Sequence, residues 1–183
     1  MIQRIEHIVS KLLAELNIDT VPVPVKKVAK NLGLTIQSYD LGSGVSGALL
    51  IKNESATIAI NPLEPEERTR FTIAHEIGHF YLHRSDNELF VDRDVLFQEK
   101  ELNGVKMLFR DGSSSTGEKK QEREANAFAA SLLMPVQLLA KKIQELDLAE
   151  FQHDEDIINH LSKKFKVSNI AMTYRLTNLG LLH

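Results

Sequence analysis

Residues 75–83 read HEIGHFYLH and place three histidines and one glutamate within nine positions. On an α-helix, His75 and His79 are four residues apart, so their imidazoles project from nearly the same side and can bind one metal ion. Glu76 lies about 100° further round the helix, where it can face a water molecule as a general base. The stretch therefore predicts a helix that carries two zinc ligands and a base. The alternative is a helix that is rich in histidine by chance.

A catalytic zinc site needs a third protein ligand, and the stretch EREANAFAASLLMP, residues 122–135, offers Glu122 and Glu124. On a helical wheel Glu122 lies on the apolar face, whereas Glu124 lies about 200° away. A carboxylate on an apolar face is costly unless it is paired or bound to metal, so we predict Glu122 as the third ligand. Asn126, one turn along, is expected to accept the outer N–H of a ligand histidine. The alternative is that both glutamates are solvated surface charges.

Tyr81 and His83 follow the two predicted histidine ligands on the same helix. His83 continues the stripe of His75 and His79, but a single straight helix rarely supplies three ligands, so we expect a surface or supporting histidine. Tyr81 is expected to be a half-buried aromatic residue, with donation to an oxyanion as the alternative. The sequence leaves the roles of these two residues open.

Composition restricts the kind of protein and the kind of metal site. The chain has 183 residues, of which 43% are hydrophobic, enough for one globular domain with a core. The absence of cysteine excludes disulfides and thiolate zinc sites, so His, Asp and Glu must hold any metal. The net charge is −3 with scattered basic residues, which does not favour nucleic acid as the main partner. Without a signal-like or membrane-spanning apolar run, we expect a cytoplasmic protein and no membrane partner.

Helices and strands are expected on both sides of the motif. Pro65, Glu66 and Glu67 are typical of a helix start, and that helix should continue into the histidine cluster. Further elements are indicated by sequence patterns: an amphipathic helix over residues 2–16, a short helix from Val25 to a stop at Gly33, a strand at 34–40, a hairpin at 46–61 and a helix that Pro135 ends or kinks. The polar stretch 110–121 is expected to be a loop, and its serine-rich part at 112–117 is more simply disordered than a lid.

The last third of the chain has the pattern of two helices joined by a tight turn. Ser168 is a natural N-cap for the second helix and Gly180 its C-terminal stop. A DNA-binding regulator with a structural zinc would use this second helix, with Arg175 as its one formal charge. A few cations in an acidic protein support that reading weakly, so we prefer helices that pack on the core or contact a partner protein. We divide the chain into a core, 1–150, and this helical segment, 151–183.

The stretch RFTIAHEIGHFYLH, followed about 40 residues later by EREANAFAASLLMP, resembles the ImmA/IrrE family of zinc metallopeptidases. The resemblance extends through LSKKFKVSNIAMTYRLTNLGLL and covers roughly residues 20–182. It implies an α+β fold, a small gluzincin-like core in which a twisted sheet packs on the motif helix. The same resemblance assigns His75, His79 and Glu122 to zinc and Glu76 to the general base.

The resemblance also implies a substrate, since members of this family often cleave a helix-turn-helix repressor in mobile-element or stress responses. We therefore predict a zinc-dependent endopeptidase whose partner is a protein, with direct nucleic-acid binding not expected. An extended substrate segment is expected to pair with an edge of the sheet near residues 46–61. The alternatives are a DNA-binding or protein-binding regulator with a structural zinc, and a catalytically silent scaffold, against which the intact Glu76 argues.

Overall fold

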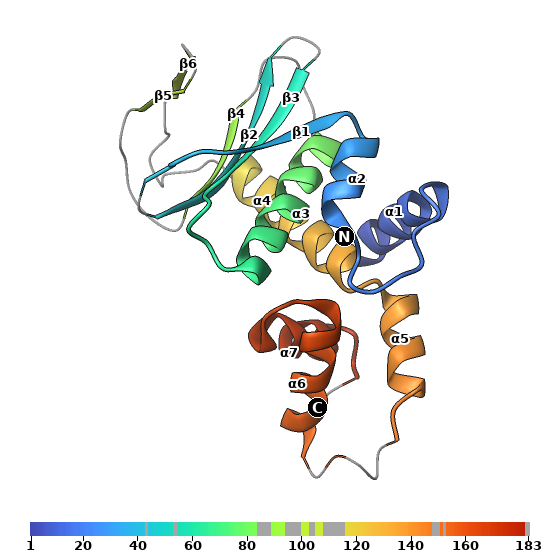
Figure 1. The fold of residues 1–183 in the computed structure, drawn as a ribbon. Helices are drawn as coiled ribbons and strands as arrows, with labels where there is room; N and C mark the ends of the chain where they lie inside the picture. Colours follow the sequence, from blue (N-terminus) through green and yellow to red (C-terminus); the bar gives the residue numbers. More distant parts are fainter. Residues whose placement is uncertain are drawn as a thin grey trace.

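The helix that carries the histidine motif lies at the centre of the computed structural model, between the sheet and a second long helix (Figure 1). The structure describes residues 1–42, 44–52, 55–83, 89–93, 100–102, 105–107, 116–147, 151 and 153–181, and it describes only the backbone of residue 52 and of those between 84 and 119. The helices are α1 (Ile2–Glu15), α2 (Val25–Asn31), α3 (Glu66–His83), α4 (Thr116–Leu133), α5 (Val136–Gln144), α6 (Asp154–Phe165) and α7 (Asn169–Asn178). The strands are β1 (Leu34–Ser38), β2 (Val45–Lys52), β3 (Ser55–Ile60), β4 (Leu89–Arg93), β5 (Lys100–Leu102) and β6 (Val105–Met107).

Four of these strands form a mixed sheet in the order β1-β3-β2-β4. Strands β1 and β3 are parallel, whereas β2 is antiparallel to both β3 and β4, with a bulge between Val45 and Gly47. Side chains alternate between the two faces of a strand, so the paired Leu49 and Ile58 enter the main core. Strands β5 and β6 form a separate antiparallel pair.

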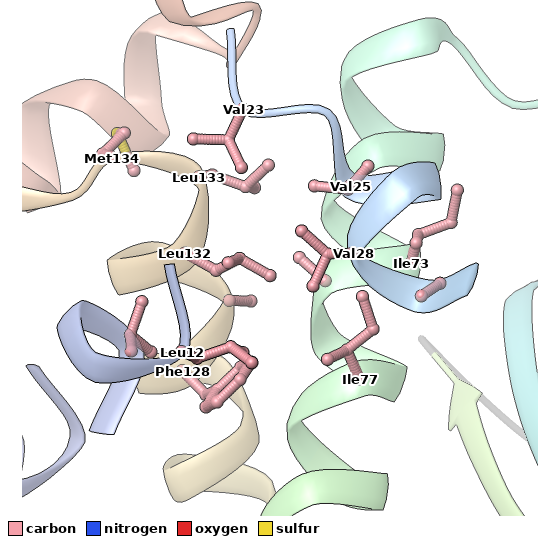
Figure 2. Close-up of a cluster of buried hydrophobic side chains, with 14 of the residues drawn as sticks. Leu12, Val23, Val25, Val28, Ile73, Ile77, Phe128, Leu132, Leu133 and Met134 are labelled. Atoms are coloured by element: carbon pink, nitrogen blue, oxygen red, sulfur yellow. The ribbon is translucent and has the colours of Figure 1, made fainter. Parts of the chain in front are cut away.

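One hydrophobic cluster joins the helices on the α3 side of the sheet. Figure 2 shows its middle, where Val28 of α2 and Ile77 of α3 face Phe128 and Leu132 of α4. The same cluster continues into the C-terminal helices through buried apolar side chains, namely Leu161, Phe165, Val167, Met172 and Leu176. The C-terminal helix pair is therefore packed against the rest of the molecule. A domain boundary at residue 150 stays a prediction.

The α+β class is confirmed, and so are the helix starts and stops that depend on local chemistry. The Ser168 side chain accepts a hydrogen bond from the Ala171 amide as an N-cap, and Gly33 and Gly180 have positive φ after their helices. Among the described residues, no helix combines the length and apolar character needed to cross a membrane.

The hairpin β2–β3 is internal to the four-stranded sheet, so the edges near it are β1 and β4, and pairing of a substrate with such an edge stays a prediction. One expectation was wrong. The polar stretch 110–121 is not a loop throughout, because α4 begins at Thr116 and continues through it. The serine-rich part at 112–115 lies outside the described residues.

Candidate metal centre

Helix α3 brings the motif into the interior because it is covered on all sides. Pro65 precedes its first residue, and Glu66 and Glu67 lie in the first turn, where acidic side chains meet the positive end of the helix dipole. Every residue from Thr72 to Phe80 is buried, which is typical of a helix in the middle of a core. His75, Glu76 and His79 are thus polar side chains in an apolar position, and such positions are usually retained for function.

Three of the predicted site residues meet at one point. The Nε2 atoms of His75 and His79 are 3.0 Å apart. Each carboxylate oxygen of Glu122 approaches a different imidazole, with Oε1 3.1 Å from the His79 Nε2 and Oε2 3.4 Å from the His75 Nε2. Metal–ligand bonds of about 2 Å let one zinc ion reach ligand atoms up to about 4 Å apart. The donor set and its spacing therefore fit zinc.

Asn126 determines which nitrogen of His75 carries the proton. The Asn126 Oδ1 lies 3.0 Å from the His75 Nδ1, and an amide oxygen can only accept a hydrogen bond. The His75 Nδ1 therefore donates, and the Nε2, on the side of Glu122 and His79, is the ring nitrogen that is left to bind a metal. Glu122 and Asn126 are one turn apart on α4, so a single helix face supplies both contacts to His75.

Glu122 is a carboxylate at neutral pH. Burial alone would raise its pKa, but hydrogen bonding and charge interactions with His75 and His79 outweigh this and lower the pKa to about 2. A ligand that is already ionised does not have to release a proton when it binds a metal. The electrostatics of the cluster thus favour a cation at the place where the three side chains meet.

Glu76 lies between the two histidines in sequence and has 0% of its surface exposed. Both of its carboxylate oxygens are buried. A carboxylate is costly to bury in an apolar interior, and a carboxylate is one of the side chains that can act as a general base.

Glu124 is the residue whose environment differs most from the prediction. Its side chain is only 14% exposed and its Oε2 lies 3.5 Å from the His83 Nε2, whereas the Glu122 side chain is 49% exposed. The expectation that Glu122 is the more buried of the two was wrong. Glu122 contacts His75 and His79 while half of its side chain stays exposed, whereas Glu124 contacts His83, one turn further along α3. His83 is therefore a partner of Glu124, and burial lowers the pKa of His83.

Two further features of the site were not foreseen from sequence. A Cβ atom on Gly78 would lie 3.1 Å from both the Cα and the carbonyl oxygen of Ala125, so this glycine allows α3 and α4 to approach closely. The ring of Phe71 stacks on that of His75, with centroids 6.1 Å apart. A glycine between the motif histidines is a signal for close helix packing, but the sequence alone does not identify the partner helix.

The comparisons with known proteins identify the family of the chain. The family described as the IrrE N-terminal-like domain, a peptidase family, matches residues 29–177. The chain is also similar to the radiation response metalloprotease IrrE of Deinococcus radiodurans, at 30% identity over 124 residues. That similarity covers 68% of this chain but 31% of the relative, so the chain spans less than a third of the relative's length. With most of its length matched, both helices of the site included, the chain belongs to the family of IrrE N-terminal-like peptidase domains.

Proposed function

We propose that this chain is a zinc-dependent endopeptidase whose site consists of His75, His79, Glu122 and Glu76. The observation that carries the proposal is the convergence of two imidazole nitrogens and an ionised carboxylate beside a buried glutamate. Family membership supports the same activity, since a metallopeptidase requires a metal and a base at one place.

His75, His79 and Glu122 hold the zinc, and Asn126 keeps the His75 ring in the tautomer that can bind it. When bound, zinc supplies Lewis acidity that polarises the scissile carbonyl and makes a water molecule easier to deprotonate. The Glu76 carboxylate accepts the proton of the attacking water and then transfers it to the leaving amine. Because Glu76 is shielded from solvent, the proton stays available for this second transfer.

The substrate that we propose is a helix-turn-helix transcriptional repressor, cleaved in a stress or mobile-element response in the cytoplasm. The relative named as a radiation response metalloprotease supports the link to stress. For the scissile segment we propose strand addition at β4, because β4 is an outer strand of the sheet in the described part of the chain, whereas the hairpin β2–β3 is internal.

The alternative of a DNA-binding regulator with a structural zinc receives little support from the second C-terminal helix. Arg175, the residue expected to contact phosphate, is 4% exposed and donates to the Glu6 carboxylate and to the Met134 carbonyl. It is therefore not free to bind DNA. We propose that residues 151–183 form a helical segment with a role in packing or protein binding.

The test is the replacement of Glu76 by Gln, which keeps the shape of the side chain but removes its ability to accept a proton. The variant and wild type are co-expressed with candidate helix-turn-helix repressors, and cleavage fragments are quantified. We expect Glu76→Gln to retain zinc and to lose about 10²–10⁴-fold in rate. Glu155→Gln, an exposed change on α6, is the matched control.

A zinc-loaded Glu76→Gln protein that cuts as fast as wild type would refute the mechanism. Wild-type protein that binds zinc but cleaves no repressor would favour the regulator with a structural zinc.

A further inference from the structure

A cleft of about 970 Å³ lies between the core helices α3 and α4 and the C-terminal helices α6 and α7. Figure 1 shows α7 facing the lower end of α3 across this region. The volume is at the upper end of the range for ligand-binding pockets. The cleft is thus large enough for several side chains of a bound polypeptide.

The cleft reaches the candidate metal centre. Two of its lining residues, Phe71 and Asn126, are also the residues that contact the His75 ring, by stacking and by hydrogen bonding respectively. The ligand residues do not themselves line the cleft, so a segment bound there would lie next to the residues that contact His75 rather than on the metal ligands.

Most of the exposed lining of the cleft is apolar, although charged side chains at the start of α3 and near the end of α6 also line it. The floor contains Leu133, Met134 and Val167, all buried. On the rim, Ile170 and Tyr174 of α7 are 70% and 69% exposed. Large exposed apolar side chains that gather at one cleft are typical of a binding site rather than of ordinary surface.

The exposed face of α7 carries no charge. Its exposed side chains are Asn169, Ile170, Thr173, Tyr174, Thr177 and Asn178. The one arginine of this helix points inward to Glu6. A helix that reads DNA needs cations to neutralise phosphates, whereas an uncharged apolar and hydroxyl face complements an uncharged polypeptide.

We propose that this cleft binds an uncharged, apolar segment of the protein substrate adjacent to the scissile bond, with Ile170 and Tyr174 as specificity-determining residues. This inference rests on the proposed function. It assigns the helix-turn-helix pattern of residues 154–181 to substrate recognition. The exposed face of α7 would contact a protein, whereas a DNA-binding helix would contact bases with the same face.

The experiment measures binding to the zinc-loaded Glu76→Gln protein, so that it does not depend on cleavage. The probes are short fluorescein-labelled peptides of three designs, apolar and uncharged, acidic, or basic, together with a random-sequence DNA duplex, all followed by fluorescence polarisation. We expect the apolar peptides to bind most tightly. Tyr174→Ala should weaken that binding by at least about tenfold, the usual effect of removing an aromatic anchor, and Tyr174→Phe should retain it.

Thr177→Ala is the matched control, because Thr177 is exposed on the same helix but does not line the cleft. The inference would be overturned if Tyr174→Ala and Thr177→Ala weakened peptide binding equally, or if apolar peptides were not preferred. It would also be overturned if the protein bound DNA tightly and Tyr174→Ala abolished that binding. If apolar peptides bind as expected while no repressor is cleaved, the cleft stands and the peptidase proposal fails. If the repressor is cleaved and Tyr174→Ala changes neither peptide binding nor the KM for the repressor, the peptidase proposal stands and the inference about the cleft fails.

Discussion

Glu122 bridges two histidines because its two oxygens are directed to different rings. One lies 3.1 Å from His79 and the other 3.4 Å from His75, and these contacts account for a pKa of about 2 in a side chain that is half exposed. Glu124, two residues later, contacts His83. The two glutamates therefore differ in the histidines that they contact, although both are carboxylates. We expect that replacing them lowers the affinity for zinc to different degrees.

We expect Glu122→Ala to lose the most zinc affinity, because it removes a ligand. Asn126→Ala should lose about 10–100-fold, the usual effect of removing the hydrogen-bond partner of a ligand histidine. Glu124→Ala should lose less zinc affinity than either of these variants. A small loss is still expected, because the His83 ring lies next to the His79 ring. A competition titration against a chromophoric zinc chelator measures all three, with Glu155→Ala as the control. A loss in Glu124→Ala as large as that in Glu122→Ala would contradict the assignment of the third ligand.

Much of the arrangement at the residue scale could be predicted from the sequence, because it follows from helical geometry. A four-residue spacing brings His75 to His79, and the same spacing brings Glu122 to Asn126. The burial of Glu122 and Glu124 could not be predicted in this way. A helical wheel assigns faces from the neighbours within one helix, whereas burial depends on which other helix covers each face.

At the scale of elements, the site depends on how closely α3 and α4 approach. Gly78 lies between the motif histidines and faces the backbone of Ala125, three residues after Glu122. Without a side chain at position 78, α4 comes near enough for the Glu122 carboxylate to reach both rings. The absence of a Cβ atom on α3 thus contributes directly to the geometry of the metal centre.

We expect Gly78→Ala to lower both stability and zinc affinity. Alanine favours the helix by about 1 kcal/mol, but a Cβ atom 3.1 Å from backbone atoms forces the helices apart at a cost of about 1–3 kcal/mol. The net loss in the free energy of unfolding should be about 1 kcal/mol by urea denaturation, and larger for Gly78→Val. An increase in stability for Gly78→Ala would mean that α4 can shift away from α3 at little cost. Close packing of the two helices would then not be what positions the metal ligands.

Local sequence signals predicted the individual elements better than their partners. Pro65 with two acids, the Ser168 cap and the glycine stops at 33 and 180 act within a few residues, so they could be recognised in sequence. The parallel pairing of β1 with β3, and the addition of β4 next to β2, join segments that are distant in the chain. Strand order of this kind results from the packing of the whole core, which no short pattern encodes.

At the scale of the whole molecule, two arginines attach the C-terminal helices to the rest of the chain. The Arg70 side chain donates to the carbonyls of Val23, Phe165 and Lys166, and so joins α3 to the end of α6. Arg175 joins α7 to the other side of the core. Between these two attachments lies the apolar cleft, so its width depends on both.

Arg175 binds two groups that have few other ways to be satisfied. Its guanidinium donates to the Met134 carbonyl at 3.0 and 2.8 Å, near the C-terminal end of α4, where helix carbonyls have no partner within the helix. It also forms a two-pronged ion pair with Glu6 of α1, and Ser131 donates to the same carboxylate at 2.7 Å. One side chain therefore connects α1, α4 and α7.

We predict that Arg175→Met costs about 3–5 kcal/mol of the free energy of unfolding, because it removes the charged partner of a largely buried Glu6 carboxylate, to which Ser131 still donates, and the donor to the Met134 carbonyl. Urea denaturation of the zinc-loaded protein at neutral pH measures this. Arg175→Lys keeps the positive charge but not the planar guanidinium group that donates to two acceptors at once, so it should recover only part of the lost stability. In the double variant Glu6→Gln with Arg175→Met the cost should fall short of the sum of the single changes by about 0.5–3 kcal/mol.

The same substitution tests whether α7 is held in place for binding. If Arg175 fixes the wall of the cleft, Arg175→Met should weaken apolar peptide binding while the zinc content stays as in wild type, because no contact of Arg175 involves His75, His79 or Glu122. Unchanged unfolding energy in Arg175→Met would show that the apolar contacts of α6 and α7 are sufficient to dock them. In that case the ion pair with Glu6 would have to be explained by something other than the architecture of the cleft.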